Sequence, residues 1–243
     1  ITNYVVMNPT ANALLAAGAA PVMAHARQEV AEMARLAGAL VLNIGTLSGP
    51  WIEAMHAAAA AARAAEVPII LDPVGAGATT LRTETVAALL ADGPVTVIRG
   101  NASEILAVAA AGGAARGVDS VHDAEAARDA AASLARTHGT IVCVSGATDY
   151  VTDGEREVAI ANGVPLMARI TGMGCTASAL VAAHVAVGEE PRTATACAMA
   201  VMGIAGELAA EQAAGPGSLQ VGFLDALHGL GEADLRARVQ VRA

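Results

Sequence analysis

Residues 171–175, Thr-Gly-Met-Gly-Cys, form a glycine turn that leads directly into a stretch of small residues, Thr176 to Val187. Such a turn can form a phosphate site, because glycines let the backbone approach a ligand and the free N–H groups of a helix start bind anionic oxygens. Taken alone, a glycine before a helix is more often only a turn, so the phosphate interpretation depends on the residues that accompany it. All 14 basic residues are Arg, so the chain has no lysine. A Walker-type phosphate lysine and Schiff-base chemistry are therefore excluded, and phosphate chemistry must use backbone amides, arginine and metal.

Cys175 stands at the start of the helix that follows this turn. A helix N-terminus lowers the pKa of a thiol, so we expect Cys175 to serve as a nucleophile or proton acceptor; the alternative is a small residue packed against the sheet. For Cys143 and Cys197 we favour such buried packing. Three cysteines without CxxC spacing argue against a disulfide framework or zinc site and favour a reducing compartment.

Three further side chains could support phosphate chemistry. Asp72 ends an apolar run before Pro73, where its carboxylate could hold Mg²⁺ through water or merely stabilise a turn. Glu104 lies three residues after Asn101, which fits a capping box and also a carboxylate facing metal-bound water. Arg99 would supply the positive charge of a lysine-free site; otherwise it is a surface or salt-bridged arginine.

The histidines and the single tryptophan carry no predicted chemistry. The six histidines lack metal-ligand spacing, and we assign them no role. We expect Trp51, next to Gly49-Pro50, to anchor the packing of the core.

Composition excludes several classes of protein. A net charge of −9 without a basic cluster, and only 2% aromatic residues, argue against nucleic-acid binding. Alanine dominates the mean hydropathy of +0.52, and charged residues interrupt the apolar stretches, so we expect no membrane span. The cysteine usage makes the cytoplasm the expected compartment. Ala- and Val-rich faces favour an oligomer. Because the first residue is Ile, we expect N-terminal sequence to precede it.

Alternating apolar and helical segments predict an α/β fold. The predicted strands are Ala39–Ile44, Pro68–Leu71, Val95–Ile98 and Thr140–Val144. The predicted helices around them are Ala20–Gly38, Pro50–Ala65, Thr83–Ala91, Ser103–Ala111 and Asp123–Thr137. Each gap allows a crossover, so the sheet is expected to be parallel. Tyr150–Ile160, around Asp153-Gly154, predicts an antiparallel edge hairpin, and three helices follow: Cys175–Val187, Arg192–Ala214 and Leu219–Gly229.

No linker interrupts the chain, so we expect residues 1–243 to form one domain. In such a sheet, ligands bind outside the carboxyl ends of the strands. Five polar or glycine-rich segments are expected there, and we name them together the rim: Asn43–Thr46, Asp72–Gly77, Arg99–Glu104, Ser145-Gly146 and Thr171–Cys175. Five such loops on one edge indicate a ligand site.

Several motifs occur in one order along nearly the whole chain. They are Ile1-Thr2-Asn3, Ala19–Ala24, Asn43–Leu47, Leu71–Thr79 with Arg82, Arg99–Glu104, Gly117–Ser120, Thr171–Cys175 and Gly215–Ser218. In this ordered set the sequence strongly resembles the hydroxyethylthiazole kinase family of thiamin biosynthesis. The resemblance implies a three-layer ribokinase-like α/β fold, with helices on both faces of the sheet, and a homotrimer with active sites at subunit boundaries. It also implies Mg-ATP-dependent phosphorylation of the primary hydroxyl of 4-methyl-5-(2-hydroxyethyl)thiazole.

The resemblance also implies roles for individual residues. The thiazole pocket would be lined by Asn3, Val5, Met23, Gly45 and Thr46, and the reacting hydroxyl would lie beside Gly172 and Cys175. ATP would be contacted by Arg99 and Ser145, and Mg²⁺ would be organised by Asp72 and Glu104. The transferring group would be offered backbone amides by Gly172, Gly174 and Cys175. The chain departs from the commoner pattern in having Met173 between the two glycines and Ser145 in place of threonine.

Other functions fit the same turn, because an anion site does not name its acceptor. A kinase of hydroxymethylpyrimidine or of a sugar would share the fold. An ATP-dependent dehydratase of hydrated nicotinamide nucleotides would release ADP and phosphate without a phosphorylated alcohol. A non-catalytic thiazole- or nucleotide-binding trimer would produce no ADP.

Overall fold

The computed structural model describes residues 1–112, 124–188 and 190–242. In these residues, seven strands form one sheet in the order β1 to β7. The strands are β1 (Leu40–Asn43), β2 (Ile69–Asp72), β3 (Val97–Asn101), β4 (Ile141–Ser145), β5 (Asp149–Thr152), β6 (Glu157–Ile160) and β7 (Val241–Arg242). β1 to β4 pair in parallel and β4 to β7 antiparallel. The predicted mostly parallel sheet with an antiparallel edge hairpin is confirmed, and β7 extends that edge.

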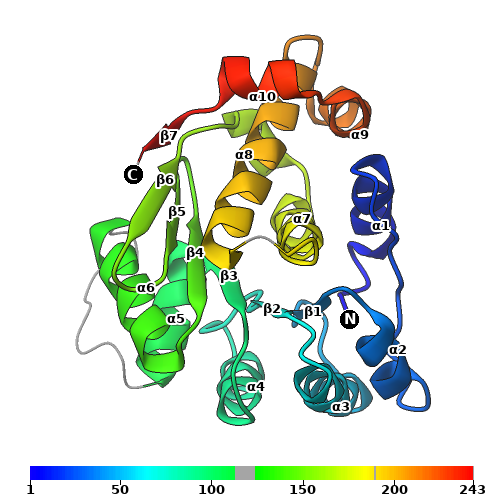
Figure 1. Ribbon diagram of the computed structural model, residues 1–243, viewed down its shortest axis with the longest axis vertical. Coiled ribbons are helices and arrows are strands. Elements are labelled where there is room, and N and C mark those ends of the chain that lie inside the picture. Colours follow the sequence, from blue (N-terminus) through cyan, green and yellow to red (C-terminus); the bar gives the residue numbers. More distant parts are fainter. Residues whose placement is uncertain (113–123, 189, 243) are drawn as a thin grey trace.

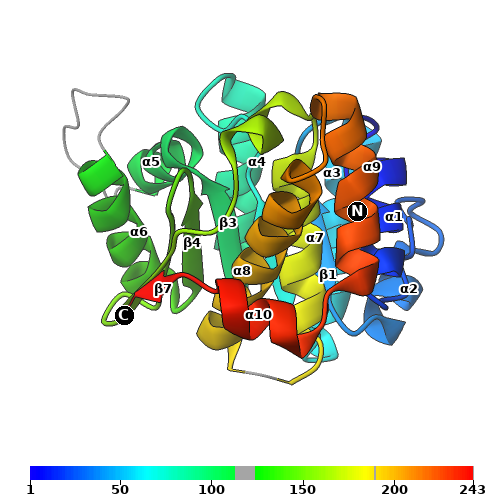
Figure 2. The same ribbon diagram turned by 90° about the horizontal axis from the view of Figure 1, so that it is seen from above.

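Helices cover both faces of the sheet, which gives three layers (Figures 1 and 2). The crossover helices α3 (Gly49–Ala64), α4 (Thr80–Ala91), α5 (Ala102–Ala111) and α6 (Ala124–His138) lie on one face. On the other face lie α7 (Met173–Val185) and α8 (Pro191–Ala210), flanked by α1 (Met7–Ala16) and α9 (Pro216–Gly229). Consecutive parallel neighbours joined by right-handed crossovers place their connecting helices on the same face.

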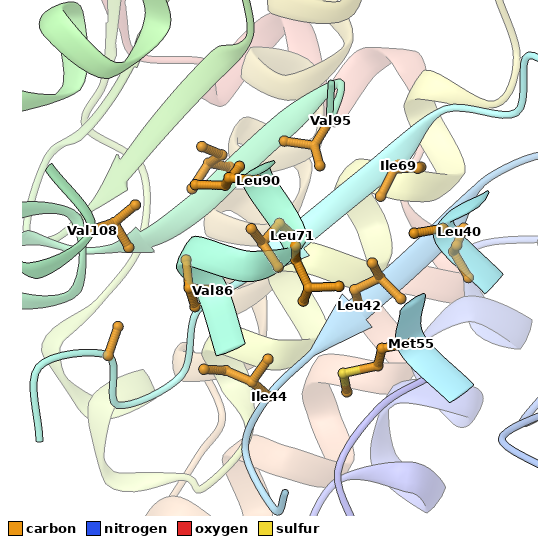
Figure 3. Packing of buried hydrophobic residues seen from close by; sticks show 14 of the residues in the cluster. Leu40, Leu42, Ile44, Met55, Ile69, Leu71, Val86, Leu90, Val95 and Val108 are labelled. Atoms are coloured by element: carbon orange, nitrogen blue, oxygen red, sulfur yellow. The ribbon is translucent and has the colours of Figure 1, made fainter. Parts of the chain in front are cut away.

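The alternation of side chains along each strand divides the core into two parts. Leu40, Leu42 and Leu71 face α3 and α4, and Figure 3 shows them packed with Met55 from α3. The opposite face includes Cys143 of β4, which belongs to the core that α7 and α8 cover and is buried as predicted. Cys197 is exposed on α8, so its predicted burial is wrong. The alternation of side chains along a strand determines the burial of Cys143, whereas the exposure of Cys197 depends on which face α8 turns toward the sheet.

The N-terminal region differs most from the prediction. Of the predicted helix Ala20–Gly38 only α2 (Val30–Leu36) is helical, because the side chains before Val30 are mostly exposed and no burial stabilises a helix there. Helix α1 was not predicted; it starts at Met7 without a side-chain cap or an acidic residue, just ahead of Asn8-Pro9, a pair that is itself a signal for a helix start. Trp51 is buried as predicted, and its Nε1–H donates to the Thr2 carbonyl at 3.1 Å.

The C-terminal region holds more structure than the three predicted helices. α8 ends at Ala210, and α10 (Glu232–Arg238) follows α9 before β7. Among the described residues, α8 is the one helix whose length and apolar composition would allow it to cross a membrane. However, 61% of its apolar window is buried inside the protein. Such burial is typical of a core helix, because its apolar faces are covered by protein.

Candidate active site

The parallel register brings the predicted rim together. Asn43 at the end of β1 pairs with Asp72 at the end of β2, and Asn101 of β3 pairs with Ser145 of β4. These positions are the carboxyl ends of the parallel strands, where open α/β sheets bind ligands. The polar residues that the sequence placed on separate loops therefore lie along one edge.

Residues 1–3 run beside β1 and place Asn3 on this edge. The Ile1 nitrogen donates to the Val41 carbonyl at 2.7 Å, and the Asn43 N–H donates to the Ile1 carbonyl at 3.0 Å. Asn3 then lies directly over Gly45, where an added Cβ would be 2.5 Å from Asn3 Nδ2. Gly45 is therefore required by this close approach.

A chain of hydrogen bonds links three elements beneath the rim. Asn3 Nδ2 lies 2.8 Å from Asn43 Oδ1 and 3.5 Å from Cys175 Sγ, to which it donates. Asn43 Nδ2 in turn donates to Asp72 Oδ2 at 2.7 Å, and Ser178 Oγ donates to the same oxygen at 2.9 Å. Sequence reasoning gave Asn43 and Ser178 no role. Asn43 carried the same signal as Asp72, a polar residue ending an apolar strand.

Asp72 is fully buried, with one carboxylate oxygen free. Burial raises its pKa to about 6, while the Arg99 charge and the bonds from Ser178 and Asn43 act in the opposite direction. Its Oδ1 atom is buried and has no hydrogen-bond partner among the described residues. A buried carboxylate with an unused oxygen is suited to accept a water molecule or a cation, and its side chain makes no bond typical of an Asx turn.

The start of α7 has the geometry of an anion site. Gly172 caps the helix in the left-handed region, with φ 84° and ψ 0°, and the first helical bond runs from the Thr176 N–H to the Gly172 carbonyl at 2.8 Å. Among the described residues, the N–H groups of Met173, Gly174 and Cys175 have no acceptor. These groups, at the positive end of the helix dipole, can bind an anionic oxygen.

The guanidinium of Arg99 lies beside this helix start. An added Cβ at Gly174 would be 2.8 Å from Arg99 Nη1, and Arg99 Nη2 donates to Ser145 Oγ at 2.5 Å. Arg99 is 7% exposed, so it is not a surface arginine, and it forms no salt bridge within the described residues. A buried cation without a carboxylate within salt-bridge distance among the described residues favours the binding of an anion here.

Glu104 forms the capping box that the sequence allowed. Its Oε2 accepts from the Asn101 N–H, and its own N–H donates to Asn101 Oδ1, both at 2.9 Å. Its Oε1 also accepts from the Gly75 N–H at 2.9 Å, so Glu104 joins the start of α5 to the loop after β2. The negative charge of Glu104 raises the pKa of Asp72, which makes the two carboxylates electrostatic neighbours.

The thiol of Cys175 differs from the expectation. Burial, and then the charge of Asp72, raise its pKa, although hydrogen bonds from Asn43 and Asn3 lower it. The predicted lowering of this pKa is therefore wrong, since desolvation and the neighbouring carboxylate of Asp72 outweigh the lowering effects of the two hydrogen bonds and of Arg99. Cys175 is a neutral thiol at neutral pH.

The remaining predicted pocket residues, Thr46, Val5 and Met23, differ in their surroundings. Thr46 Oγ1 accepts from the Tyr4 N–H at 3.1 Å, whereas the side chain of Val5 is exposed. Met23 lines a mostly apolar cavity of about 570 Å³ between α1, α2 and α7, and Cys175 lines the same cavity. Val5 does not line this cavity, so the described residues bring Met23 and Cys175 together but leave Val5 apart.

Asp149 is a site neighbour that sequence reasoning missed. It begins β5, and its Oδ1 accepts from the Gly146 N–H at 2.9 Å, which closes the turn after Ser145. Burial raises the pKa of Asp149 to about 6, against the lowering effects of the Gly146 N–H and Arg99. An acidic residue between a Ser-Gly turn and a predicted hairpin was the available signal.

Among the described residues, no group of three or more His, Cys, Asp or Glu side chains could hold a metal ion by itself. The motif Gly117–Ser120 lies outside the described residues.

Comparison with known proteins gives a consistent result. A model of the hydroxyethylthiazole kinase family matches residues 1–233. The hydroxyethylthiazole kinase of Nitratidesulfovibrio vulgaris strain Miyazaki F is 58% identical over 241 residues, which cover 99% of this chain and 90% of that protein. The hydroxyethylthiazole kinase of Leptospira biflexa is 49% identical over 242 residues, 100% of this chain and 91% of that one.

Solved structures agree with the fold. A hydroxyethylthiazole kinase from Pyrococcus horikoshii superposes with a TM-score of 0.93 at 47% identity, covering 100% of this chain and 91% of that chain. Pyridoxal kinase from Staphylococcus aureus superposes with a TM-score of 0.60 at 18% identity, covering 80% and 79%, and shows the shared fold alone. The chain therefore belongs to the hydroxyethylthiazole kinase family and is a phosphotransferase with a ribokinase-like fold.

Proposed function

We propose that the rim carries out the family's reaction at the start of α7: transfer of the γ-phosphoryl group of ATP to the primary hydroxyl of 4-methyl-5-(2-hydroxyethyl)thiazole, in thiamin biosynthesis. The observation that carries this proposal is the juxtaposition of unbonded amides at residues 173–175 with the buried guanidinium of Arg99. Together they supply fixed positive charge without a lysine. A preorganised set of donors of this kind stabilises charge that develops in a transition state.

Arg99 and Ser145 would contact ATP, and residues 172–175 would receive the migrating phosphoryl group. The bond between Arg99 Nη2 and Ser145 Oγ holds the guanidinium in place before ATP arrives. Phosphoryl transfer passes through a loose transition state, in which positioning and charge neutralisation matter more than covalent chemistry. Gly172 and Gly174 contribute by having no side chain between the amides and the ligand.

Asp72 and Glu104 would organise Mg²⁺ around the phosphates. The unpartnered, buried Oδ1 of Asp72 and the nearby carboxylate of Glu104 fit this ion, which takes one or two protein carboxylates and fills its other positions with water and phosphate oxygens. When bound, Mg²⁺ would neutralise charge on the phosphates. Asn43 and Ser178 fix the other oxygen of Asp72, so Oδ1 keeps its direction.

The thiazole would lie beside Asn3, Val5, Met23, Gly45, Thr46 and Gly172. Asn3 donates to Cys175 Sγ, which holds the thiol at the edge of the cavity that Met23 lines. Because the thiol is neutral, we assign Cys175 the task of directing the substrate hydroxyl by a hydrogen bond. A loose transition state places little demand on a strong base, since most of the bond to the leaving group is broken early.

We also propose that residues 1–243 form one cytoplasmic catalytic domain that assembles as a homotrimer with sites at subunit boundaries. Exposed apolar side chains in the N-terminal region and after α7 support the trimer: Tyr4, Val5, Leu15, Val22, Met23, Leu36 and Val187. Burial of such a patch against another subunit is favourable. Val5 and Met23 would then complete the thiazole pocket at the boundary.

The test is to incubate the protein with Mg-ATP and hydroxyethylthiazole and to detect the thiazole monophosphate by mass spectrometry. A panel containing hydroxymethylpyrimidine, pyridoxal and a sugar checks the acceptor. Release of ADP and phosphate without a phosphorylated alcohol would indicate the dehydratase class instead. Calorimetric thiazole binding with no ADP would indicate a binding protein, and light scattering measures the oligomer.

A further inference from the structure

Arg82, near the start of α4, ties together the two loops that follow β1 and β2. Its Nη2 donates to the Gly45 carbonyl at 2.6 Å. Its Nη1 donates to the Val74 carbonyl and, at 3.4 Å, to the Ile44 carbonyl. One guanidinium thus bridges backbone atoms that lie about 30 residues apart in the chain and belong to separate loops of the rim.

Among the described residues, the guanidinium of Arg82 forms hydrogen bonds only with these backbone carbonyls. No carboxylate in the described part of the chain forms a salt bridge with it. A guanidinium presents several N–H donors in a rigid fork, which suits simultaneous bonds to several carbonyl oxygens, whereas a lysine ammonium is a single point.

The neighbouring backbone is shaped around this side chain. Gly75 follows Val74 with φ 72°, and an added Cβ there would be 2.9 Å from Arg82 Nη1. The Gly75 N–H donates to Glu104 Oε1 at 2.9 Å, so the loop after β2 is held by Glu104 from one side and by Arg82 from the other. On the β1 side, Gly45 carries Asn3 above it.

We propose that Arg82 is a positioning residue for phosphoryl transfer, which sets the distance between the thiazole loop at Gly45 and the phosphate and metal loop at Gly75. This inference rests on the proposed function, because it assigns those two loops to the two substrates. The reaction requires the hydroxyl and the phosphorus to be aligned, and a misplacement of about 1 Å can lower the rate by about 10²-fold.

The chain contains a matched control. Arg63, at the end of α3, also donates to three backbone carbonyls: those of Pro94, Leu89 and Gly93, each at 3.0 Å. Those residues end α4 and lead into the start of β3, so they lie at the amino ends of the parallel strands, whereas the rim lies at the carboxyl ends. Removing Arg63 therefore deletes a similar arginine clamp without touching either substrate loop.

The experiment compares Arg82→Ala, Arg82→Lys and Arg63→Ala in thermal denaturation, in steady-state kinetics with thiazole and Mg-ATP varied, and in calorimetric thiazole binding. We expect Arg82→Ala to raise the thiazole KM and to lower kcat/KM by about 10- to 100-fold. Arg82→Lys should recover part of this loss. Arg63→Ala should lower Tm by a similar amount to Arg82→Ala and keep kcat/KM within about twofold of wild type.

Equal kinetic effects of Arg82→Ala and Arg63→Ala at matched temperature below Tm would overturn the inference, since both would then act through stability alone. If Arg82→Ala does not fold, Arg82→Gln and Arg82→Lys decide by the same kinetic comparison. Failure of the proposed function has a different signature, because the wild-type protein itself would then form no thiazole phosphate. In that case unchanged thiazole affinity in Arg82→Lys would also overturn the positioning role.

Discussion

The guanidinium of Arg99 lies so close to Gly174 that a Cβ at position 174 would stand 2.8 Å from Nη1. The buried charge is thereby held against the first turn of α7, beside the unbonded amides. Neither the helix start nor the arginine alone makes a strong phosphate site in a chain without lysine. Their contact combines a helix dipole with a full positive charge.

Gly174→Ala separates activity from stability at this contact. The atom that the new methyl group meets is the end of a long side chain, so Arg99 should move aside and the protein should fold. Gly174 is the second residue of α7, where alanine costs the helix no more than glycine does, so Tm should change little. We expect kcat/KM to fall by about 10- to 100-fold, since a preorganised donor is displaced.

Gly222→Ala in α9 is the control for Gly174→Ala. An added Cβ there would meet its nearest neighbour, Ala209 Cβ, at 3.4 Å, an ordinary contact that does not involve Arg99. Thermal denaturation and initial rates measure both variants. Full activity of Gly174→Ala would show that the position of Arg99 is immaterial.

Cys175 should contribute less than a general base does. Its pKa is raised by burial and by Asp72, so little thiolate exists at neutral pH. We expect Cys175→Ser, which retains a hydrogen-bonding group, to keep kcat within about tenfold, below the 10²–10⁴-fold contribution of a general base. Slow alkylation of Cys175 by iodoacetamide at pH 7 would check the thiol independently. A loss beyond about 10³-fold would restore the role of proton acceptor.

Asp72 should link activity to pH. Its pKa of about 6 lies above the ordinary 3.8. A cation-binding role needs the ionised form, so the rate should fall as the pH drops through about 6. A pH profile of kcat/KM for Mg-ATP measures this inflection. An unchanged rate down to pH 5 would contradict the role.

Asp72→Asn tests the same group through stability. A carboxyl whose pKa is raised by folding favours the folded state below its unfolded pKa, and this contribution disappears as the pH rises through about 6. At pH 7.5 the ionised group is therefore costly, by about 3 kcal/mol for a shift of about two units. We expect Asp72→Asn to raise the free energy of unfolding at pH 7.5 and to abolish Mg-dependent turnover. Denaturant titration at pH 5 and 7.5 separates the two effects.

Asp149 should matter for ATP and not for the thiazole. Its carboxylate accepts from the Gly146 N–H and so fixes the turn that presents Ser145 to Arg99. Asp149→Ala should raise the ATP KM by about fivefold, because this turn loses a bond worth about 1 kcal/mol. Asp149→Asn retains an acceptor oxygen and should show a smaller effect. Equal changes in both KM values would point to a general loss of structure.

The sequence by itself predicted the parallel strands β1 to β4 and the edge of the sheet on which the site lies. The apolar runs Ala39–Ile44, Pro68–Leu71 and Thr140–Val144 predicted parallel strands whose polar ends meet, and the register confirms this. The glycine turn before α7 was equally local, since only glycine readily adopts the φ of 84° at Gly172. Such features depend on neighbours in the chain, and a pattern of residues can record them.

Only the tertiary structure decided the network of Asn3, Asn43, Asp72 and Cys175, and the sign of the shift in the Cys175 pKa. Asn3 and Cys175 are 172 positions apart, and their contact depends on residues 1–3 running beside β1. A helix start can be recognised in the sequence, and its dipole is expected to lower a thiol pKa. In the folded protein, burial and the charge of Asp72 raise the pKa of Cys175 instead. Desolvation and charge proximity depend on which distant segments pack together, so no local pattern could supply them.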